Sequence, residues 1–253
     1  MLVSVVKRVG EGDHAVICLH GWFGSAEGWG YLPEVVDKSR FSYWFPEMRG
    51  YGARRDESGS FTMKEYAADA LAVADELGLD RFSVLGHSMG GKAGACLVAQ
   101  APDRVRALVG VSPVPPAPVP LDEAGHGLFF GAAENDDNRR AIIDFTTGGR
   151  NSAAWLDDMV AFSRGSSSQE AFAGAVESWV NDDHVAEVSG ATTPISCIVG
   201  ENDPALSADV MRQSWMQMYP NVDLVELPSC GHYAMYEAPV WLVTQVETFL
   251  ADK

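Results

Sequence analysis

The sequence contains no apolar run of about 18 residues, the length that a membrane-spanning helix requires. Its opening stretch, Met1 to Arg8, holds too few apolar residues for a secretory signal peptide. Basic residues are also scarce, because 18 Lys and Arg stand against 35 Asp and Glu and leave a net charge of −17. A surface of that sign repels phosphate backbones and anionic lipids. We therefore expect a cytoplasmic protein with no nucleic-acid partner and no membrane partner.

Cysteine is sparse and does not occur at the spacing of metal ligands. The four cysteines lie far apart, at positions 18, 96, 197 and 230, and we expect buried, reduced thiols. The sequence contains no complete phosphate-binding G-x-x-x-x-G-K-[ST] loop and no dinucleotide-binding G-x-G-x-x-G fingerprint. We therefore predict no metal and no cofactor.

What the sequence does contain is a regular alternation of strand and helix patterns. The run at 14–19 is apolar on both faces, which is typical of a central strand in a parallel sheet. Alternation at this spacing indicates βαβ units, and so a mostly parallel central sheet with helices on both faces. The predicted strands are 2–9, 14–19, 41–45, 82–85, 105–111, 195–199 and 222–227, and the predicted helices are 27–36, 61–77, 92–101, 208–218 and 239–250.

The pattern changes after residue 112. Five of the eight residues at 113–120 are proline, which excludes a helix and favours a stiff, extended connection. Beyond it, no clear strand occurs before residue 190, but amphipathic helical stretches cover 138–145, 152–164 and 169–180. We predict a helical cap at residues 114–190, inserted into an α/β core that comprises residues 1–113 and 191–253.

The central motif is Gly86-His87-Ser88-Met89-Gly90, which matches G-x-S-x-G between a predicted strand and a predicted helix. In that context the motif is typical of a nucleophile elbow, where a serine occupies a strained turn with little room for side chains beside it. Flanking glycines supply that room. We predict that Ser88 is a nucleophile; the alternative is an ordinary glycine-rich turn with an incidental serine.

Two more loops at the ends of predicted strands offer the partners that a serine nucleophile needs. Asp203 follows the strand at 195–199, and His232 follows the strand at 222–227. A histidine takes the serine proton, and a carboxylate orients the imidazole and stabilises its protonated form. We predict these roles for His232 and Asp203; Glu201 and Asp209 are the rival carboxylates nearby.

Five stretches now follow one another in order: His20-Gly21-Trp22, Arg49-Gly50-Tyr51-Gly52, the elbow at 86–90, Gly200-Glu201-Asn202-Asp203 and Gly231-His232. In these motifs the sequence resembles the α/β-hydrolase superfamily. The resemblance implies an α/β-hydrolase fold with a cap inserted after the sixth strand, although the N-terminus supplies one strand where the family often has two. It also implies an oxyanion hole formed by the backbone N–H groups of Trp22 and Met89. We expect His20 to brace that loop through hydrogen bonds; the alternative is that it takes part in the chemistry.

The function that we predict is hydrolysis of carboxylic esters through an acyl-Ser88 intermediate. A helical cap favours a restricted, water-shielded pocket and a small to medium, largely apolar ester substrate. Either the cap aromatics line that pocket or they pack the cap's own core. The expected substrate-binding residues are Phe23, His87, Trp155, Phe162 and Trp179.

Other reactions remain open, since fold does not determine function. Members of the superfamily that use the same triad include C–C bond hydrolases, enol-lactonases, cofactor-free haloperoxidases and lyases. A carboxylate-bearing substrate would require a cation in the pocket, and the cap offers Arg139, Arg140, Arg150 and Arg164. A ligand receptor that retains the triad is a third class. The sequence is compatible with a monomer or a dimer.

Overall fold

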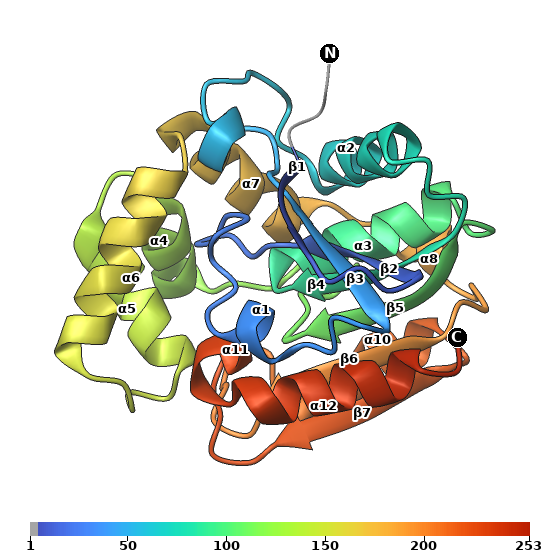
Figure 1. Ribbon diagram of the computed structural model, residues 1–253. Coiled ribbons are helices and arrows are strands. Elements are labelled where there is room, and N and C mark those ends of the chain that lie inside the picture. The colour runs from blue at the N-terminus through green and yellow to red at the C-terminus, as the bar shows by residue number, and fades with distance from the viewer. Residues whose placement is uncertain (1–4) are drawn as a thin grey trace.

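A computed structural model describes residues 5–253, which form a seven-stranded sheet in the order β1-β3-β2-β4-β5-β6-β7 (Figure 1). Among these strands β1 runs antiparallel to β3, and the other neighbours pair in parallel. The predicted mostly parallel sheet is confirmed; residues 2–4 of the first predicted strand lie outside the described residues. The strands are β1 (Val5–Val9), β2 (His14–Leu19), β3 (Phe41–Pro46), β4 (Phe82–His87), β5 (Val105–Val111), β6 (Ile195–Gly200) and β7 (Val222–Leu227).

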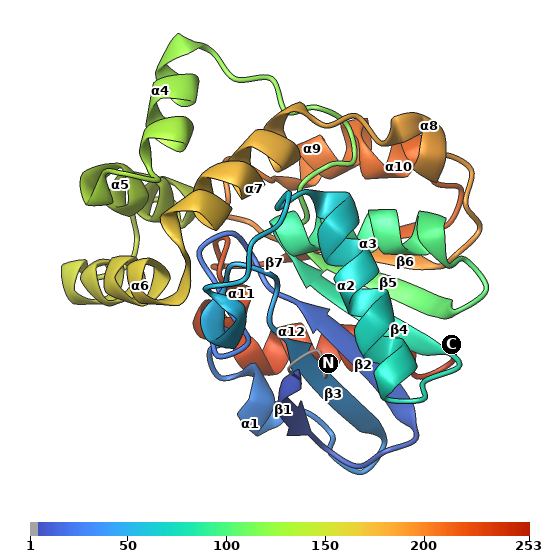
Figure 2. The ribbon, with the colours of Figure 1, turned by 90° about the horizontal axis from the view of Figure 1, so that it is seen from above.

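Helices cover both faces of the sheet, as predicted (Figures 1 and 2). On one face α2 (Met63–Glu76) packs against α3 (Met89–Gln100), and α8 (Val185–Val188) lies beside α3. On the other face α12 (Pro239–Leu250) packs against α1 (Leu32–Val35). This arrangement leaves the carboxyl ends of the parallel strands at one edge of the sheet, where open α/β sheets bind ligands.

Between β5 and β6 the chain forms a group of helices that extends beyond the sheet (Figure 2). Three were predicted from helical periodicity and are confirmed as α5 (Asp136–Thr146), α6 (Ala153–Ser166) and α7 (Gln169–Asn181). The sequence pattern missed α4 (Glu123–Gly131), which contains three glycines and so has low helix propensity. Among the described strands this group follows the fifth in chain order and not the sixth, because one N-terminal strand precedes β2 where the family often has two.

Two predicted helices are shorter than expected. The helix expected at 27–36 is reduced to α1, since Gly30 adopts a φ of +52° and forms a turn before it. The helix expected at 208–218 is interrupted at Ser214, whose φ of −124° and ψ of −86° lie outside the helical region. It therefore divides into α9 (Ala208–Gln213) and α10 (Trp215–Met218). Two further short elements are η1 (Gly52–Arg54) and α11 (Ala234–Glu237).

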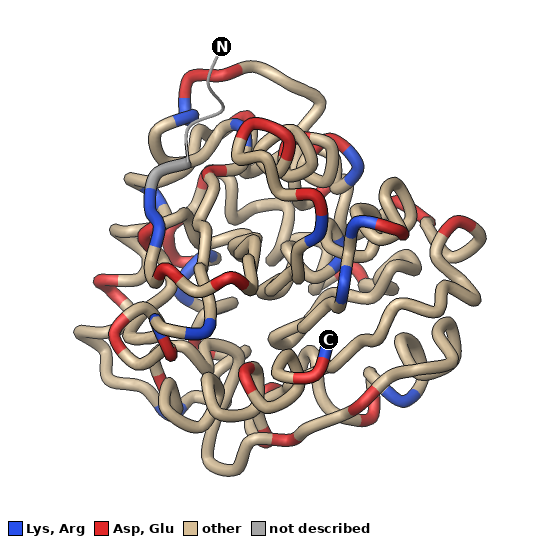
Figure 3. The backbone as a smooth tube through the Cα atoms, turned by 45° about the vertical axis from the view of Figure 1, so that its right-hand side comes forward, with Lys and Arg blue, Asp and Glu red and all other residues tan. Residues whose placement is uncertain are grey.

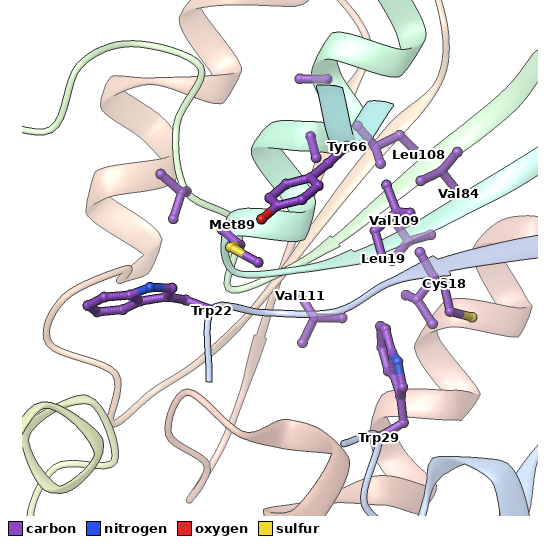
Figure 4. Close-up of a cluster of buried hydrophobic side chains, with 14 of the residues drawn as sticks. Cys18, Leu19, Trp22, Trp29, Tyr66, Val84, Met89, Leu108, Val109 and Val111 are labelled. Atoms are coloured by element: carbon purple, nitrogen blue, oxygen red, sulfur yellow. The ribbon is translucent and has the colours of Figure 1, made fainter. Parts of the chain in front are cut away.

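The hydrophobic core lies on both sides of the central strands. All residues of β4 and β6 are buried, and Figure 4 shows Val84 among Leu108 and Val109 of the adjacent strand. The four cysteines are buried free thiols, as expected. Acidic positions are distributed around the backbone in Figure 3 and are not gathered in one segment. Within residues 5–253, no helix combines the length and the apolar character needed to cross a membrane.

Candidate active site

Ser88 occupies the turn between β4 and α3 with a φ of +54° and a ψ of −118°. A non-glycine residue in a sparsely populated backbone region costs about 1–3 kcal/mol and persists only where its surroundings impose that conformation. Here the chain approaches itself closely: a Cβ atom added to Gly86 would lie 2.4 Å from the Gly90 carbonyl oxygen, and one added to Gly90 would lie 2.1 Å from the Leu19 oxygen. Packing therefore requires both motif glycines, and the turn has the geometry of a nucleophile elbow.

His232 and Asp203 meet at the carboxyl ends of β7 and β6. Asp203 Oδ2 accepts a hydrogen bond from His232 Nδ1 over 2.7 Å. The other carboxylate oxygen, Oδ1, accepts from the backbone N–H groups of Ala205 and Leu206 at 3.0 and 3.1 Å. Only 1% of Asp203 and 6% of His232 is exposed. Three donors thus orient the carboxylate so that it holds the ring proton on Nδ1, which leaves Nε2 as the basic nitrogen.

The rival carboxylates lie in other surroundings. Glu201 accepts a hydrogen bond from the Ser229 N–H group at 2.8 Å in an exposed contact. Asp209 pairs with Arg212 at 2.6 Å on the surface of α9. Neither rival contacts a histidine in these hydrogen bonds, whereas Asp203 does.

Ser88 and His232 line the same cavity, which has a volume of about 240 Å³. Of the residues predicted to contact substrate or the oxyanion, Trp22, Phe23 and Trp179 also lie on its wall. Sequence reasoning missed the rest of the wall. These residues come from the proline-rich connection, from α4 and α5, and from the loops that follow Asp203 and His232: Val114, Val119, Pro120, Leu121, Phe129, Ile142, Phe145, Thr146, Ala205, Leu206 and Tyr233.

One signal could have found part of this missed wall. The proline-rich connection begins directly after the carboxyl end of β5, which is the sheet edge where the elbow also lies. The Val114 N–H group donates to the carbonyl oxygen of Ser88 at 3.0 Å. The connection therefore runs past the nucleophile turn before the helices begin.

The three other predicted substrate residues lie outside the cavity wall. His87 is buried behind the site, where its Nε2 donates to the His232 carbonyl oxygen at 3.0 Å and its ring lies 4.8 Å from that of His232. Trp155 on α6 packs edge-on against Tyr233 at 5.6 Å. Phe162 packs toward Gly28, whose added Cβ would lie 3.1 Å from its ring. These placements follow from the orientation of α6 and β4, which the sequence pattern does not specify.

The loop after β2 lies against the elbow (Figure 4). A Cβ atom added to Gly21 would lie 3.2 Å from Ser88 Cβ, so the backbone next to Trp22 reaches the nucleophile. The Trp22 indole donates to the Phe172 carbonyl oxygen at 2.8 Å, which fixes this loop against α7. Met89 is the first residue of α3, and the N–H groups of a first helical turn have no acceptor within the helix. Both backbone positions predicted for the oxyanion hole therefore lie beside Ser88.

His20 supports the loop after β2 through two hydrogen bonds. Its Nε2 accepts from the Met48 N–H group at 3.3 Å, so its Nδ1 carries the proton and donates to the Gly21 carbonyl oxygen at 3.0 Å. Burial lowers the pKa of His20 to about 4, and burial followed by the neighbouring His232 lowers that of His87 well below its usual value. Both imidazoles are therefore neutral near neutral pH and act as hydrogen-bonding supports.

No Asp, Glu, Lys or Arg side chain is among the residues that line the cavity. The four candidate arginines have other partners. Arg139 is buried over the ring of Phe172, and the other three pair with acidic side chains: Arg140 with Asp157, Arg150 with Glu237 and Arg164 with Asp136. Among residues 5–253 no three His, Cys, Asp or Glu side chains are grouped as metal ligands.

A family model described as the alpha/beta hydrolase fold matches residues 14–239. The chain is 29% identical to a pimeloyl-[acyl-carrier protein] methyl ester esterase of Nitrosomonas europaea, over 94% of this chain and 96% of that protein. It is 28% identical to a 2-hydroxymuconate semialdehyde hydrolase of Pseudomonas putida, over 82% and 76% of the two chains. A hydrolase from Oleispira antarctica has the same fold, with a TM-score of 0.86, 16% identity and coverage of 98% and 94%.

Proposed function

The chain belongs to the alpha/beta hydrolase fold family and is a hydrolase, and from that premise we propose that it cleaves carboxylic esters through an acyl-Ser88 intermediate. The observation that carries this proposal is the buried Asp203–His232 pair on the wall of a cavity that also exposes Ser88. The similarity to an esterase over nearly the whole of both chains supports it.

The reaction follows from the arrangement of these groups. Ser88 Oγ attacks the ester carbonyl carbon while His232 Nε2 accepts its proton, and Asp203 stabilises the imidazolium that forms. The N–H groups of Met89 and Trp22 donate to the oxyanion, each contributing about 3–4 kcal/mol in the transition state. His232 then protonates the leaving alkoxide oxygen. Water, activated by the same nitrogen, cleaves the acyl-enzyme to the acid and restores Ser88.

The cavity favours an uncharged acyl group of small to medium size. Apart from Ser88, Thr146 and His232, its wall is built from apolar side chains and Tyr233, and no Lys or Arg is available to neutralise a substrate carboxylate. A buried unpaired charge is strongly unfavourable, so a carboxylate-bearing substrate of a C–C bond hydrolase fits this wall poorly. We propose that residues 114–190 act as the cap that shields the acyl-enzyme from bulk water.

Hydrolysis of a p-nitrophenyl ester series from acetate to decanoate tests this function. Wild type should hydrolyse the series, and Ser88→Ala should lose about 10⁶ in turnover, the loss expected for a triad nucleophile. Ser112→Ala is the matched control, since Ser112 is also a buried serine at positive φ after a strand but is not on the cavity wall. Equal rates in wild type and Ser88→Ala, or no turnover of any ester, would refute the esterase function.

A further inference from the structure

One buried lysine has no part in the proposed chemistry. Lys92 lies on α3, one helical turn beyond Ser88, and is 0% exposed. Its Nζ donates to three backbone carbonyl oxygens: those of Ala117 at 3.1 Å, Trp179 at 3.0 Å and Asp182 at 2.7 Å. An ammonium group has three N–H donors, so each finds one acceptor. Lys92 therefore acts on the backbone and has no donor left for a substrate.

These three carbonyls belong to the two ends of the helical group between β5 and β6. Ala117 lies in the proline-rich connection that leads into the group. Trp179 and Asp182 lie at the C-terminal end of α7, which leads out of it. The last carbonyls of a helix have no N–H partner within the helix, and the helix dipole favours a cation at that end. Lys92, on the neighbouring helix α3, supplies both the missing N–H donors and the positive charge at this end of α7.

The two ends of the helical group also contact each other. The Val119 N–H group donates to the Val180 carbonyl oxygen at 2.8 Å, and His184 N–H donates to Pro116 at 3.0 Å. Val119 and Trp179 both lie on the cavity wall. One side chain of α3, the helix that begins at Met89 directly after Ser88, thus bonds both ends of the helical group that contributes to the cavity wall.

We propose that Lys92 is a positioning residue that pins both ends of the helical group to α3 and so sets the acyl-chain selectivity of the cavity. Its effect on catalysis rests on the proposed esterase function, whereas the pinning itself does not. Without the three hydrogen bonds the two ends separate from α3, and the wall formed by Val119 and Trp179 moves away from Ser88. Longer acyl chains then bind better, while the reacting groups keep their geometry.

Protonation of Lys92 controls this bridge. Burial lowers the pKa of Lys92 to about 8, against the opposing effects of Cys96 on α3 and of Asp182 and Asp183 after α7. The other ionisable groups nearby are the buried His184 and the exposed Lys64–Glu187 pair. A neutral amine has two N–H donors for three carbonyls, so the bridge is complete below that pKa and incomplete above it.

The test compares Lys92→Met with Lys64→Met. Lys64 is the matched control, because it is an exposed lysine on the adjacent helix α2 whose Nζ pairs with Glu187 at 2.7 Å.

One readout is the ratio of kcat/KM for p-nitrophenyl decanoate to kcat/KM for p-nitrophenyl acetate. The other is hydrogen exchange of residues 114–121 and 179–184. For Lys92→Met we expect a ratio about tenfold higher, mainly through KM, and exchange about tenfold faster in both segments, the factor that corresponds to about 1.4 kcal/mol. Lys64→Met should match wild type in both.

A lower melting temperature for Lys92→Met with an unchanged ester ratio and unchanged local exchange would overturn the proposal, because a residue that only stabilises the core gives that result. If neither wild type nor either variant hydrolyses any ester, the esterase function fails, and hydrogen exchange alone decides the role of Lys92.

If Lys92→Met does not fold, both readouts are taken on wild type at about pH 7 and about pH 9, with hydrogen exchange corrected for its intrinsic pH dependence. The ratio and the exchange must then rise with pH, and constant values refute the bridge.

Discussion

Replacement of Asp203 by asparagine tests how the structure controls the histidine tautomer. Asp203 Oδ1 is held by the N–H groups of Ala205 and Leu206, while Oδ2 faces His232 Nδ1. In Asp203→Asn the amide oxygen must stay on the two backbone donors, so the NH₂ group is directed at His232. The imidazole then accepts at Nδ1 and carries its proton on Nε2, where it cannot take the proton of Ser88. We expect kcat/KM to fall by about 10⁴, or about 5 kcal/mol of transition-state stabilisation.

The assay is kcat/KM for the best p-nitrophenyl ester, measured beside the melting temperature. Glu201→Gln makes the same change from acid to amide two residues away, at a side chain that bonds Ser229 and not His232, and it should retain activity within about threefold of wild type. Activity of Asp203→Asn within about tenfold of wild type would refute the tautomer argument. A loss of folding in Asp203→Asn would show as a lowered melting temperature, which separates it from a loss of chemistry.

Two further predictions concern stability. Gly90→Ala would place a Cβ atom 2.1 Å from the Leu19 oxygen and should lower the free energy of unfolding in urea by about 3 kcal/mol. Gly127→Ala, on α4, meets no atom within 4 Å and should raise it by about 0.5–1 kcal/mol; equal stabilities of the two variants would contradict the packing at the elbow. Burial lowers the pKa of His20 from 6.5 to about 4. As the pH falls from 6.5 toward 4, the His20 side chain is therefore protonated in the unfolded state but stays neutral in the folded state. The contribution of His20 to the free energy of unfolding is therefore complete above its unfolded-state pKa and falls by about 3 kcal/mol as the pH approaches its folded-state pKa. His20→Gln should therefore reduce the pH dependence of the free energy of unfolding in urea between these two values. An unchanged pH slope in that variant would refute the assignment.

Local sequence signals account for most of the core fold. The strand at 82–85 and the glycines around Ser88 could be predicted because a buried strand, a strained turn and a helix each leave a mark on adjacent residues. The helix predicted at 27–36 is shorter than predicted for an equally local reason: Gly30 forms a turn that apolar periodicity alone does not reveal. The glycine-rich α4 was missed because its Phe129 is held by contacts with Trp22 and Trp179, and not by helix propensity.

The sequence by itself determined the alternation of strand and helix, the placement of Ser88, Asp203 and His232 after three strands, and the break at the proline-rich connection. These features depend on neighbours in the chain. Only the tertiary structure decided which aromatics line the cavity, that Trp155 and Phe162 lie outside its wall, and that Lys92 joins both ends of the helical group. The reason is physical: the direction of a side chain relative to a distant element depends on how helices pack, and many residues far apart in the sequence share that packing.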